Sequence, residues 1–228
     1  MKKIMFNDRY GLTQAVLEGR KTQTRRILDP TMFFIRMETF EGWSKEGIGS
    51  WKASCMKRLY AAQGKELQQM IDYALRHSRY KLGETIAIAQ RYEDLRKDDE
   101  FYRLCGKNGM PLECIKYEKG CSNKMFVKAD LMPHRIRITN IRIERLQDIS
   151  DEDVIHEGFS NICFNKNMGN MLSEWCYDLC YYDAFGNSQS LHSTIAKEAY
   201  SYLIAKLYGW SLWDSNPYVF VYDFELVK

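Results

Sequence analysis

Apolar residues alternate with polar ones in two segments of the chain, and each segment predicts a long β-strand. In the first, residues 135–145, isoleucines alternate with charged residues, but the parity of the alternation changes across Asn140. One extra residue in a strand shifts every later side chain to the opposite face, so we expect a β-bulge near Asn140. In the second, residues 218–226, four apolar side chains fall on one face of a terminal strand: Phe220, Tyr222, Phe224 and Leu226.

Apolar residues at helical spacing predict two helices of several turns. In residues 59–75, apolar side chains recur every three or four positions among charged residues and glutamines, which is typical of an amphipathic helix. The second helix is predicted to begin with Ser193 as its N-cap and to stop at Gly209. Both are long enough to pack an apolar stripe against a sheet.

Glycines and capping residues delimit several shorter elements. Ser150 predicts the start of a short helix, and Gly158 predicts its end directly after Glu157. By the same reasoning we expect three further elements: a strand at 3–6, a short helix that Gly19 ends, and a strand at 85–89 after a turn at 81–84.

Three segments show no clean period, so the pattern itself does not define helices or strands in them; the first is predicted to be irregular or to form short strands. Residues 31–60 are aromatic and contain glycines, residues 91–123 are polar with several glycines, and residues 160–191 mix asparagine, glycine and aromatic residues. We expect them to be excursions from the main fold.

Length, composition and net charge indicate a globular protein but do not distinguish an enzyme from a binding protein. The chain has 228 residues, of which 45% are hydrophobic, so it can bury a full core. Its net charge of +3 is too small to predict a nucleic-acid partner by itself. No apolar run is long enough for a signal peptide or a membrane span, which favours a cytoplasmic protein with no membrane partner. The oligomeric state is not indicated.

Cysteines and glycines argue against a metal or a nucleotide cofactor. The seven cysteines show no repeated spacing, which suits reduced thiols rather than disulfides. Thiolates and an imidazole that suit zinc occur at Cys105, Cys114, Cys121 and His134. Their spacing lacks the paired C-x2-C typical of zinc sites, so free cysteines are the favoured interpretation. No glycine-rich phosphate loop is present, so we expect no cofactor.

A basic segment follows the first predicted helix and carries the most informative motif. It reads Gly-Arg-Lys-Thr-Gln-Thr-Arg-Arg over residues 19–26. With the strand before it, the strand at 85–89, the segment 146–157 that ends in Glu157 and the terminal strand, it resembles the ASCH domain in order and spacing. The resemblance implies an α+β fold with a PUA-like mixed β-barrel, in one domain spanning 1–228 with helical insertions at about 28–79, 91–123 and 160–212.

Two further likenesses refine what the resemblance implies. The segment 123–151 is similar to longer ASCH-like proteins encoded by phages and prophages. The first motif is also similar to that of small bacterial amidohydrolases that deacetylate N4-acetylcytidine, whose catalytic lysine, threonine and glutamate correspond here to Lys21, Thr24 and Glu157. The resemblance therefore implies hydrolysis of an amide on a modified nucleoside, although the insertions leave the substrate open.

These three residue types can together perform amide hydrolysis. Thr24 would be the nucleophile, and Lys21 would be its base if desolvation or neighbouring arginines lower the lysine pKa. Glu157 near Lys21 would oppose that effect. Alternatively, Glu157 activates water or carries the proton, and a charged Lys21 stabilises the oxyanion. Without the resemblance, the basic segment is typical of a solvated loop, and Glu157 of an exposed helix end.

A second reading makes the chain an RNA-binding module or a ribonuclease. Arg135 and Arg137 would share one strand face opposite Ile136 and Ile138 and could hold RNA phosphates. Residues that could bind substrate or RNA in either reading are Arg20, Arg25, Arg26, His134, Arg135 and Arg137. A solvated polar strand face is the simpler explanation of the same pattern.

Overall fold

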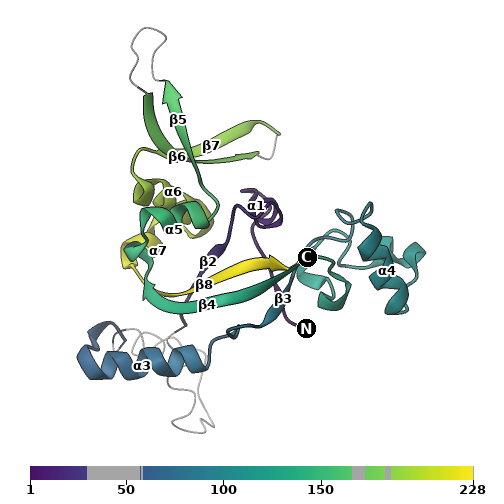
Figure 1. Cartoon of the computed structure of the whole chain (residues 1–228), viewed down its shortest axis with the longest axis horizontal. Coiled ribbons are helices and arrows are strands. Elements are labelled where there is room, and N and C mark those ends of the chain that lie inside the picture. Colours follow the sequence, from purple (N-terminus) through teal and green to yellow (C-terminus); the bar gives the residue numbers. More distant parts are fainter. Residues whose placement is uncertain (30–56, 58, 166–172, 183–185, 228) are drawn as a thin grey trace.

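The computed structural model describes residues 1–29, 57, 59–165, 173–182 and 186–227 of the chain. It is an α+β protein with a five-stranded sheet in the order β1-β3-β4-β8-β2 and a three-stranded sheet in the order β5-β6-β7 (Figure 1). The larger sheet comprises β1 (Lys3–Ile4), β2 (Gln23–Ile27), β3 (Thr85–Ile88), β4 (Arg135–Arg145) and β8 (Tyr218–Val227). The smaller comprises β5 (Ser160–Asn165), β6 (Ser173–Tyr182) and β7 (Ser188–Ser193).

Strands β4 and β8 form the centre of the larger sheet. They pair antiparallel from Arg135 opposite Val227 to Arg145 opposite Tyr218, and their register shifts between Ile138 and Asn140, which confirms the predicted bulge. The remaining pairs put β1 and β2 at opposite edges, and no pairing of β1 with β2 closes the sheet. The α+β class is confirmed, but the described strands do not form a closed barrel.

The four helices predicted from the sequence pattern are present. They are α1 (Leu12–Leu17), α3 (Gly64–Arg76), α5 (Asp151–His156) and α6 (Ala196–Tyr208), with α7 (Trp210–Ser215) after it. Gly209 ends α6 as expected, but Ser193 is not its N-cap: that position is Ile195, and the Ser193 hydroxyl accepts from the Ile195 backbone N–H instead. Within the described residues, none of the helices could cross a membrane, being too short or too polar.

The expected insertion at about 160–212 is not purely helical, because its first part contains strands that the sequence pattern did not indicate. The described residues of 160–193 form the three-stranded sheet, in which Leu179 lies opposite Leu191 and both are buried. The other positions of β7 are mostly exposed, so the strand has too few apolar residues for alternation to reveal it. Pairing with neighbouring strands, rather than local pattern, makes this segment a sheet.

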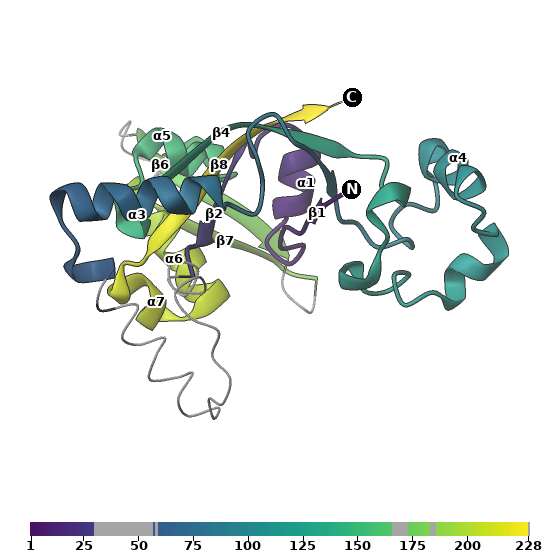
Figure 2. The same ribbon diagram turned by 90° about the horizontal axis from the view of Figure 1, so that it is seen from below.

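Residues 91–123 contain a helix that the sequence pattern did not predict. The helix α4 (Asp99–Lys107) begins where the Asp98 side chain accepts from the Phe101 backbone N–H. Together with residues 127–132 this segment encloses a small core of its own, separate from the main core. Figure 2 shows it projecting from the end of the sheet opposite to α3. The predicted irregular region 31–60 lies almost entirely outside the described residues.

Candidate functional site

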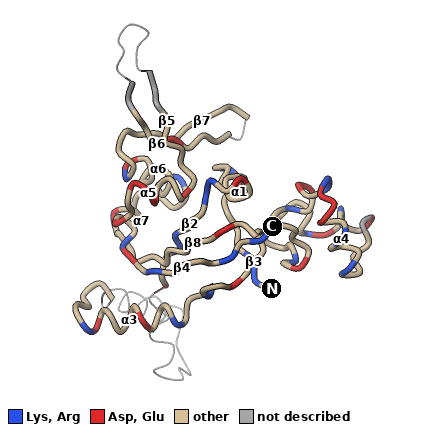
Figure 3. The backbone as a smooth tube through the Cα atoms, viewed as in Figure 1, with Lys and Arg blue, Asp and Glu red and all other residues tan. Residues whose placement is uncertain are grey.

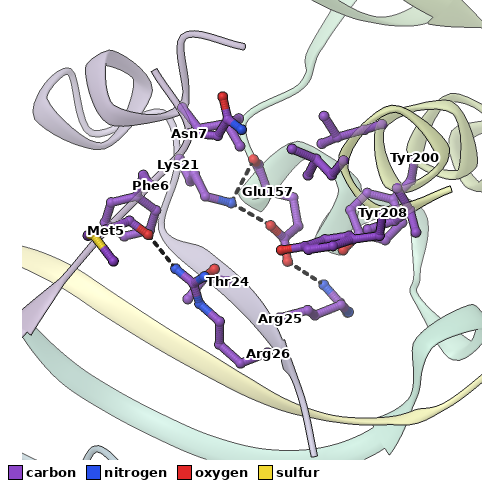
Figure 4. Close-up of a pocket in the computed structure, with 14 residues that line it drawn as sticks. Met5, Phe6, Asn7, Lys21, Thr24, Arg25, Arg26, Glu157, Tyr200 and Tyr208 are labelled. Carbon is purple, nitrogen blue, oxygen red and sulfur yellow. Dashed lines mark hydrogen bonds and ion pairs between the residues drawn. The ribbon is translucent and has the colours of Figure 1, made fainter. Parts of the chain in front are cut away.

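A cavity of about 260 Å³ opens between β2, the segment after β1, and α6. Its polar lining comes mainly from the basic motif and from Glu157, while α6 supplies Tyr200 and Tyr208 (Figure 4). The cavity thus brings together Lys21, Thr24 and Glu157, which lie up to 136 positions apart in the sequence.

Local structure explains why Lys21 points into the core. Gly19 adopts a φ of 75° after α1, and the backbone N–H of Lys21 then returns to the Ala15 carbonyl of that helix. Thr22 donates its backbone N–H to the His156 carbonyl, which ties the motif to the end of α5. From there the motif continues as β2 rather than as a loop, because its backbone pairs with β8.

Lys21 and Glu157 form a buried ion pair. Lys21 is only 2% exposed and Glu157 4%. The ammonium group donates to the Glu157 carboxylate and, at 2.9 Å, to the Glu157 backbone carbonyl. Glu157 is the C-cap of α5, which the Ser150 side chain caps at its start as predicted. The interpretation of Glu157 as an exposed helix end is therefore wrong.

Arg25 holds the other side of the Glu157 carboxylate. Its Nη1 lies 3.2 Å from Glu157 Oε1, and its Nη2 lies 2.6 Å from Glu144 and 2.7 Å from Asp153. Arg142 joins the same network through Asp153 at 2.8 Å. Glu157 therefore lies between two cations, Lys21 and Arg25, as Figure 4 shows, and its position is set from both sides.

Burial and charge shift the pKa values of these groups in different directions. Burial lowers the pKa of Lys21, and the attraction of Glu157 offsets this only in part. Burial acts to lower the pKa of Arg25 too, but there the carboxylates, Glu157 first, outweigh it and raise the pKa. Arg26 and Arg25 add a smaller repulsion that lowers the pKa of Lys21 further. The site thus holds a permanently charged arginine beside a lysine that loses its proton more readily than usual.

Thr24 lines the same cavity but stands apart from the ion pair. It is 5% exposed, and within the described part of the chain no hydrogen bond joins its hydroxyl to Lys21 or Glu157. Thr24 and Arg26 are alternate residues of β2, and both line the cavity. Arg26 donates to the Met5 backbone carbonyl at 2.6 Å.

The other predicted binding residues do not join this site. Arg20 pairs with Glu18 at 2.7 Å and lines a neighbouring cavity. His134, Arg135 and Arg137 lie at the start of β4 or just before it, and none of them lines the cavity that holds Lys21.

The expected basic face on β4 is partly neutralised. Ile136 and Ile138 are buried and Arg137 is exposed, as the alternation predicts, but Arg137 lies 3.7 Å from Glu225. Arg142 forms ion pairs with Glu144, Asp153 and Asp223. Asp223 lies on the paired strand β8, with its Oδ2 2.9 Å from Arg142 Nη1. Basic and acidic residues are interspersed along the chain (Figure 3).

Comparisons of the chain with protein-family models, with curated proteins and with solved structures found no match. The chemistry of the site is therefore inferred from its own residues. Among the residues that the structure describes, no three or more histidine, cysteine or acidic side chains are grouped so that they could hold a metal ion.

Several site residues had no distinctive signal in the sequence. Tyr200 is buried on α6 with the Arg25 guanidinium 5.8 Å from its ring centroid, and Tyr208 lies at the end of the same helix. Asp153 and Glu144 were not predicted to be partners of Arg25. These residues meet only because α5 and α6 pack against β2 and β4.

Proposed function

We propose that the chain is an ASCH-type protein that hydrolyses the exocyclic amide of an acylated nucleoside resembling N4-acetylcytidine. The observation that carries the proposal is the buried Lys21–Glu157 pair in the cavity that Thr24 lines. A nucleophile, a base with a lowered pKa and a carboxylate in one small cavity are the components that amide hydrolysis requires.

In the proposed first step, Thr24 attacks the acyl carbon. The Thr24 hydroxyl oxygen forms the new C–O bond while its proton passes to neutral Lys21. Burial favours that neutral form because it lowers the pKa of Lys21. Substrate binding or a bridging water connects the Thr24 hydroxyl to Lys21, because catalytic hydrogen bonds often tighten only in the complex.

Collapse of the tetrahedral intermediate then releases the deacylated nucleoside. Lys21, protonated in the first step, offsets the negative charge on the acyl oxygen. The C–N bond breaks, and the leaving nitrogen takes the proton from Lys21. Water then attacks the acyl carbon of the ester and gives one proton to Lys21. The bond between that carbon and the Thr24 oxygen breaks, and the oxygen takes the proton back from Lys21. Acetic acid leaves and ionises to acetate, with the Thr24 hydroxyl and neutral Lys21 regenerated. Glu157 positions the lysine throughout.

The lining of the cavity suits a nucleobase. Tyr200, Tyr208 and Phe6 supply aromatic surface beside the polar groups, and flat bases stack on such rings. A volume of about 260 Å³ matches a base with a small acyl group better than a protein or peptide substrate.

The sheet order supports the finer assignment of the fold as a PUA-like barrel open at one seam. The edges of the sheet are β1 and β2, and the Arg26 side chain of β2 reaches the carbonyl of Met5, directly after β1. One side chain therefore spans the gap that a closed barrel would fill with backbone hydrogen bonds.

Acetate release from N4-acetylcytidine and a panel of acylated nucleosides tests the proposal. Turnover is expected for the wild type and is expected to fall by about three orders of magnitude in Lys21→Met, Thr24→Val and Glu157→Gln. The matched control is Thr22→Val, because Thr22 lies in the same motif but does not line the cavity. Mass spectrometry after rapid quenching should find the acyl group on Thr24.

The pH profile provides an independent check. Because neutral Lys21 is the base, the rate should rise with pH to a plateau, with a midpoint below the ordinary lysine value of 10.5. A folded wild type that turns over no member of the panel would refute the hydrolase proposal. RNA binding or cleavage by the same preparation would then favour the RNA reading.

A further inference from the structure

A second cavity lies on the other side of Arg26 from the proposed catalytic cavity. It has a volume of about 390 Å³ and is lined by side chains from β1, β2, β8 and the turn after α3. Met5 and Arg26 line both cavities, so the Arg26–Met5 hydrogen bond across the open seam separates them. The two cavities are therefore neighbours that share Met5 and Arg26.

The second cavity carries an excess of positive charge. Lys3, Arg26 and Arg79 are among its lining residues, against one carboxylate, Asp29. The ammonium group of Lys3 is already used, because it donates to the backbone carbonyls of Met125 and Val127. Among the permanently charged side chains of the lining, the two arginines remain as groups that could hold an anion.

Arg26 and Arg79 differ from the arginines of the buried network. Arg25 lies between three carboxylates, whereas no carboxylate of a described residue forms an ion pair with Arg26 or Arg79. Of the Arg26 nitrogens, only Nη2 has an acceptor among the described residues, the Met5 carbonyl. Arg79 is exposed, and its guanidinium carbon lies 5.7 Å from the Tyr80 ring centroid. Both guanidinium groups therefore retain donors for an incoming anion.

We propose that this second cavity binds a phosphate group of a nucleotide substrate whose acylated base occupies the catalytic cavity. The inference rests on the proposed function and specifies its substrate: a nucleotide rather than a free nucleoside. The catalytic cavity, at about 260 Å³, is below the size of typical pockets for complete ligands of this kind. A phosphate is joined to its base through the ribose, so it must lie in a space beside the one that holds the base. A guanidinium group can donate two parallel hydrogen bonds to phosphate oxygens, which suits the arginines of the second cavity.

Isothermal titration calorimetry with unreactive probes tests this without requiring turnover. Cytidine 5′-monophosphate should bind the wild type at least about tenfold more tightly than cytidine, as expected for charge-assisted hydrogen bonds. Arg79→Ala should remove most of that difference. Arg76→Ala is the matched control, because Arg76 is an exposed arginine at the end of α3 that does not line the cavity. It should leave the difference unchanged.

The source of the phosphate is distinguished by further probes. Cytidine 3′-monophosphate and a short cytidine-containing RNA are titrated alongside, and tighter binding of the RNA than of either mononucleotide would assign the site to a polynucleotide backbone. Competition by inorganic phosphate should weaken nucleotide binding in the wild type but not in Arg79→Ala.

Binding and turnover separate this inference from the proposed function. A nucleotide preference that Arg79→Ala abolishes, without hydrolysis of any acylated probe, would support the phosphate site and refute the hydrolase. Hydrolysis of N4-acetylcytidine with equal affinity for nucleoside and nucleotide would overturn the phosphate site alone. Absence of nucleotide binding, or an equal loss in Arg76→Ala, would also overturn it.

Discussion

Removing the Glu157 carboxylate should destabilise the protein strongly, and more than removing the Lys21 ammonium group. Glu157→Gln keeps the size of the side chain but leaves the Lys21 ammonium, which is 2% exposed, with neutral acceptors. Arg25 is less affected, because it retains Glu144 and Asp153. The cost of the substitution therefore falls mainly on Lys21.

Two routes give the magnitude. Removing one partner of a buried ion pair costs about 3–5 kcal/mol. Lys21 could instead release its proton, which at pH 7 costs about 1.4 kcal/mol for each pH unit below its ordinary pKa of 10.5, or roughly 5 kcal/mol. We therefore expect Glu157→Gln to lower the free energy of unfolding by about 3–5 kcal/mol at pH 7.

The loss should shrink as the pH rises. Burial lowers the pKa of Lys21 in the folded protein, so between that pKa and 10.5 the unfolded chain binds more protons, and stability increases with pH. At pH 9.5 the release of the proton costs only about 1.4 kcal/mol. Urea unfolding of Glu157→Gln at pH 7 and pH 9.5, followed by tryptophan fluorescence, should show a deficit that falls to roughly 1–2 kcal/mol.

Two companion variants make the result decisive. Lys21→Met should cost less than Glu157→Gln at pH 7, since Glu157 keeps Arg25 at 3.2 Å, and its deficit should not shrink in the same way at high pH. Glu152→Gln, the same change on an exposed residue of α5, should stay within about 0.5 kcal/mol of the wild type. If Glu157→Gln matched Glu152→Gln, or lost the same stability at both pH values, the buried ion pair would not be the stabilising contact described.

Three further outcomes follow from the structure. Gly158→Ala should lower the free energy of unfolding by about 1–3 kcal/mol in urea titrations, because Gly158 has a φ of 109°; an unchanged midpoint would contradict this. Cys180 should be alkylated by iodoacetamide at pH 8 roughly 100-fold more slowly than Cys114 in peptide mapping, and Asp178→Asn should restore its rate, since the hydrogen bond to Asp178 raises the pKa of Cys180 to about 11. Burial opposes the shift, but pairing with Gln23 and the arginines lowers the pKa of Asp153 below its ordinary 3.8. The stability that ionised Asp153 contributes is therefore complete above pH 3.8 and is lost as the pH falls below it. The free energy of unfolding of Asp153→Asn should fall less steeply with decreasing pH than that of the wild type, and equal slopes would refute this.

Elements with strong local signals were predicted correctly. Local sequence determines four of these features: the isoleucine alternation of β4, its bulge near Asn140, the cap at Ser150 and the stop at Gly209. Each depends only on residues a few positions away, so it can be predicted from a single sequence. The strands of residues 160–193 were missed for the opposite reason: β7 has a single buried apolar position, β6 carries aromatic and apolar residues without clean alternation, and the three strands are joined by backbone pairing with each other. No local pattern records that pairing.

The candidate site shows the same division. The motif at residues 19–26 drew attention to Lys21 and Thr24, and the helix stop at Gly158 drew attention to Glu157. Their burial was not predicted, because a basic segment and a helix-end carboxylate are normally solvated. Arg25 was predicted to bind substrate or RNA, but its pairing with Glu157 and the position of Tyr200 beside it were seen only in the structure.

The sequence by itself determined which residues carry usable chemistry and where most helices and strands begin and end, because capping, periodicity and turn chemistry act over a few residues. Only the tertiary structure decided that Lys21, Arg25 and Glu157 meet, that water is excluded from their ion pair, and that burial lowers the pKa of the lysine. Desolvation and ion pairing depend on groups more than a hundred positions apart, so they arise when the chain packs and not before.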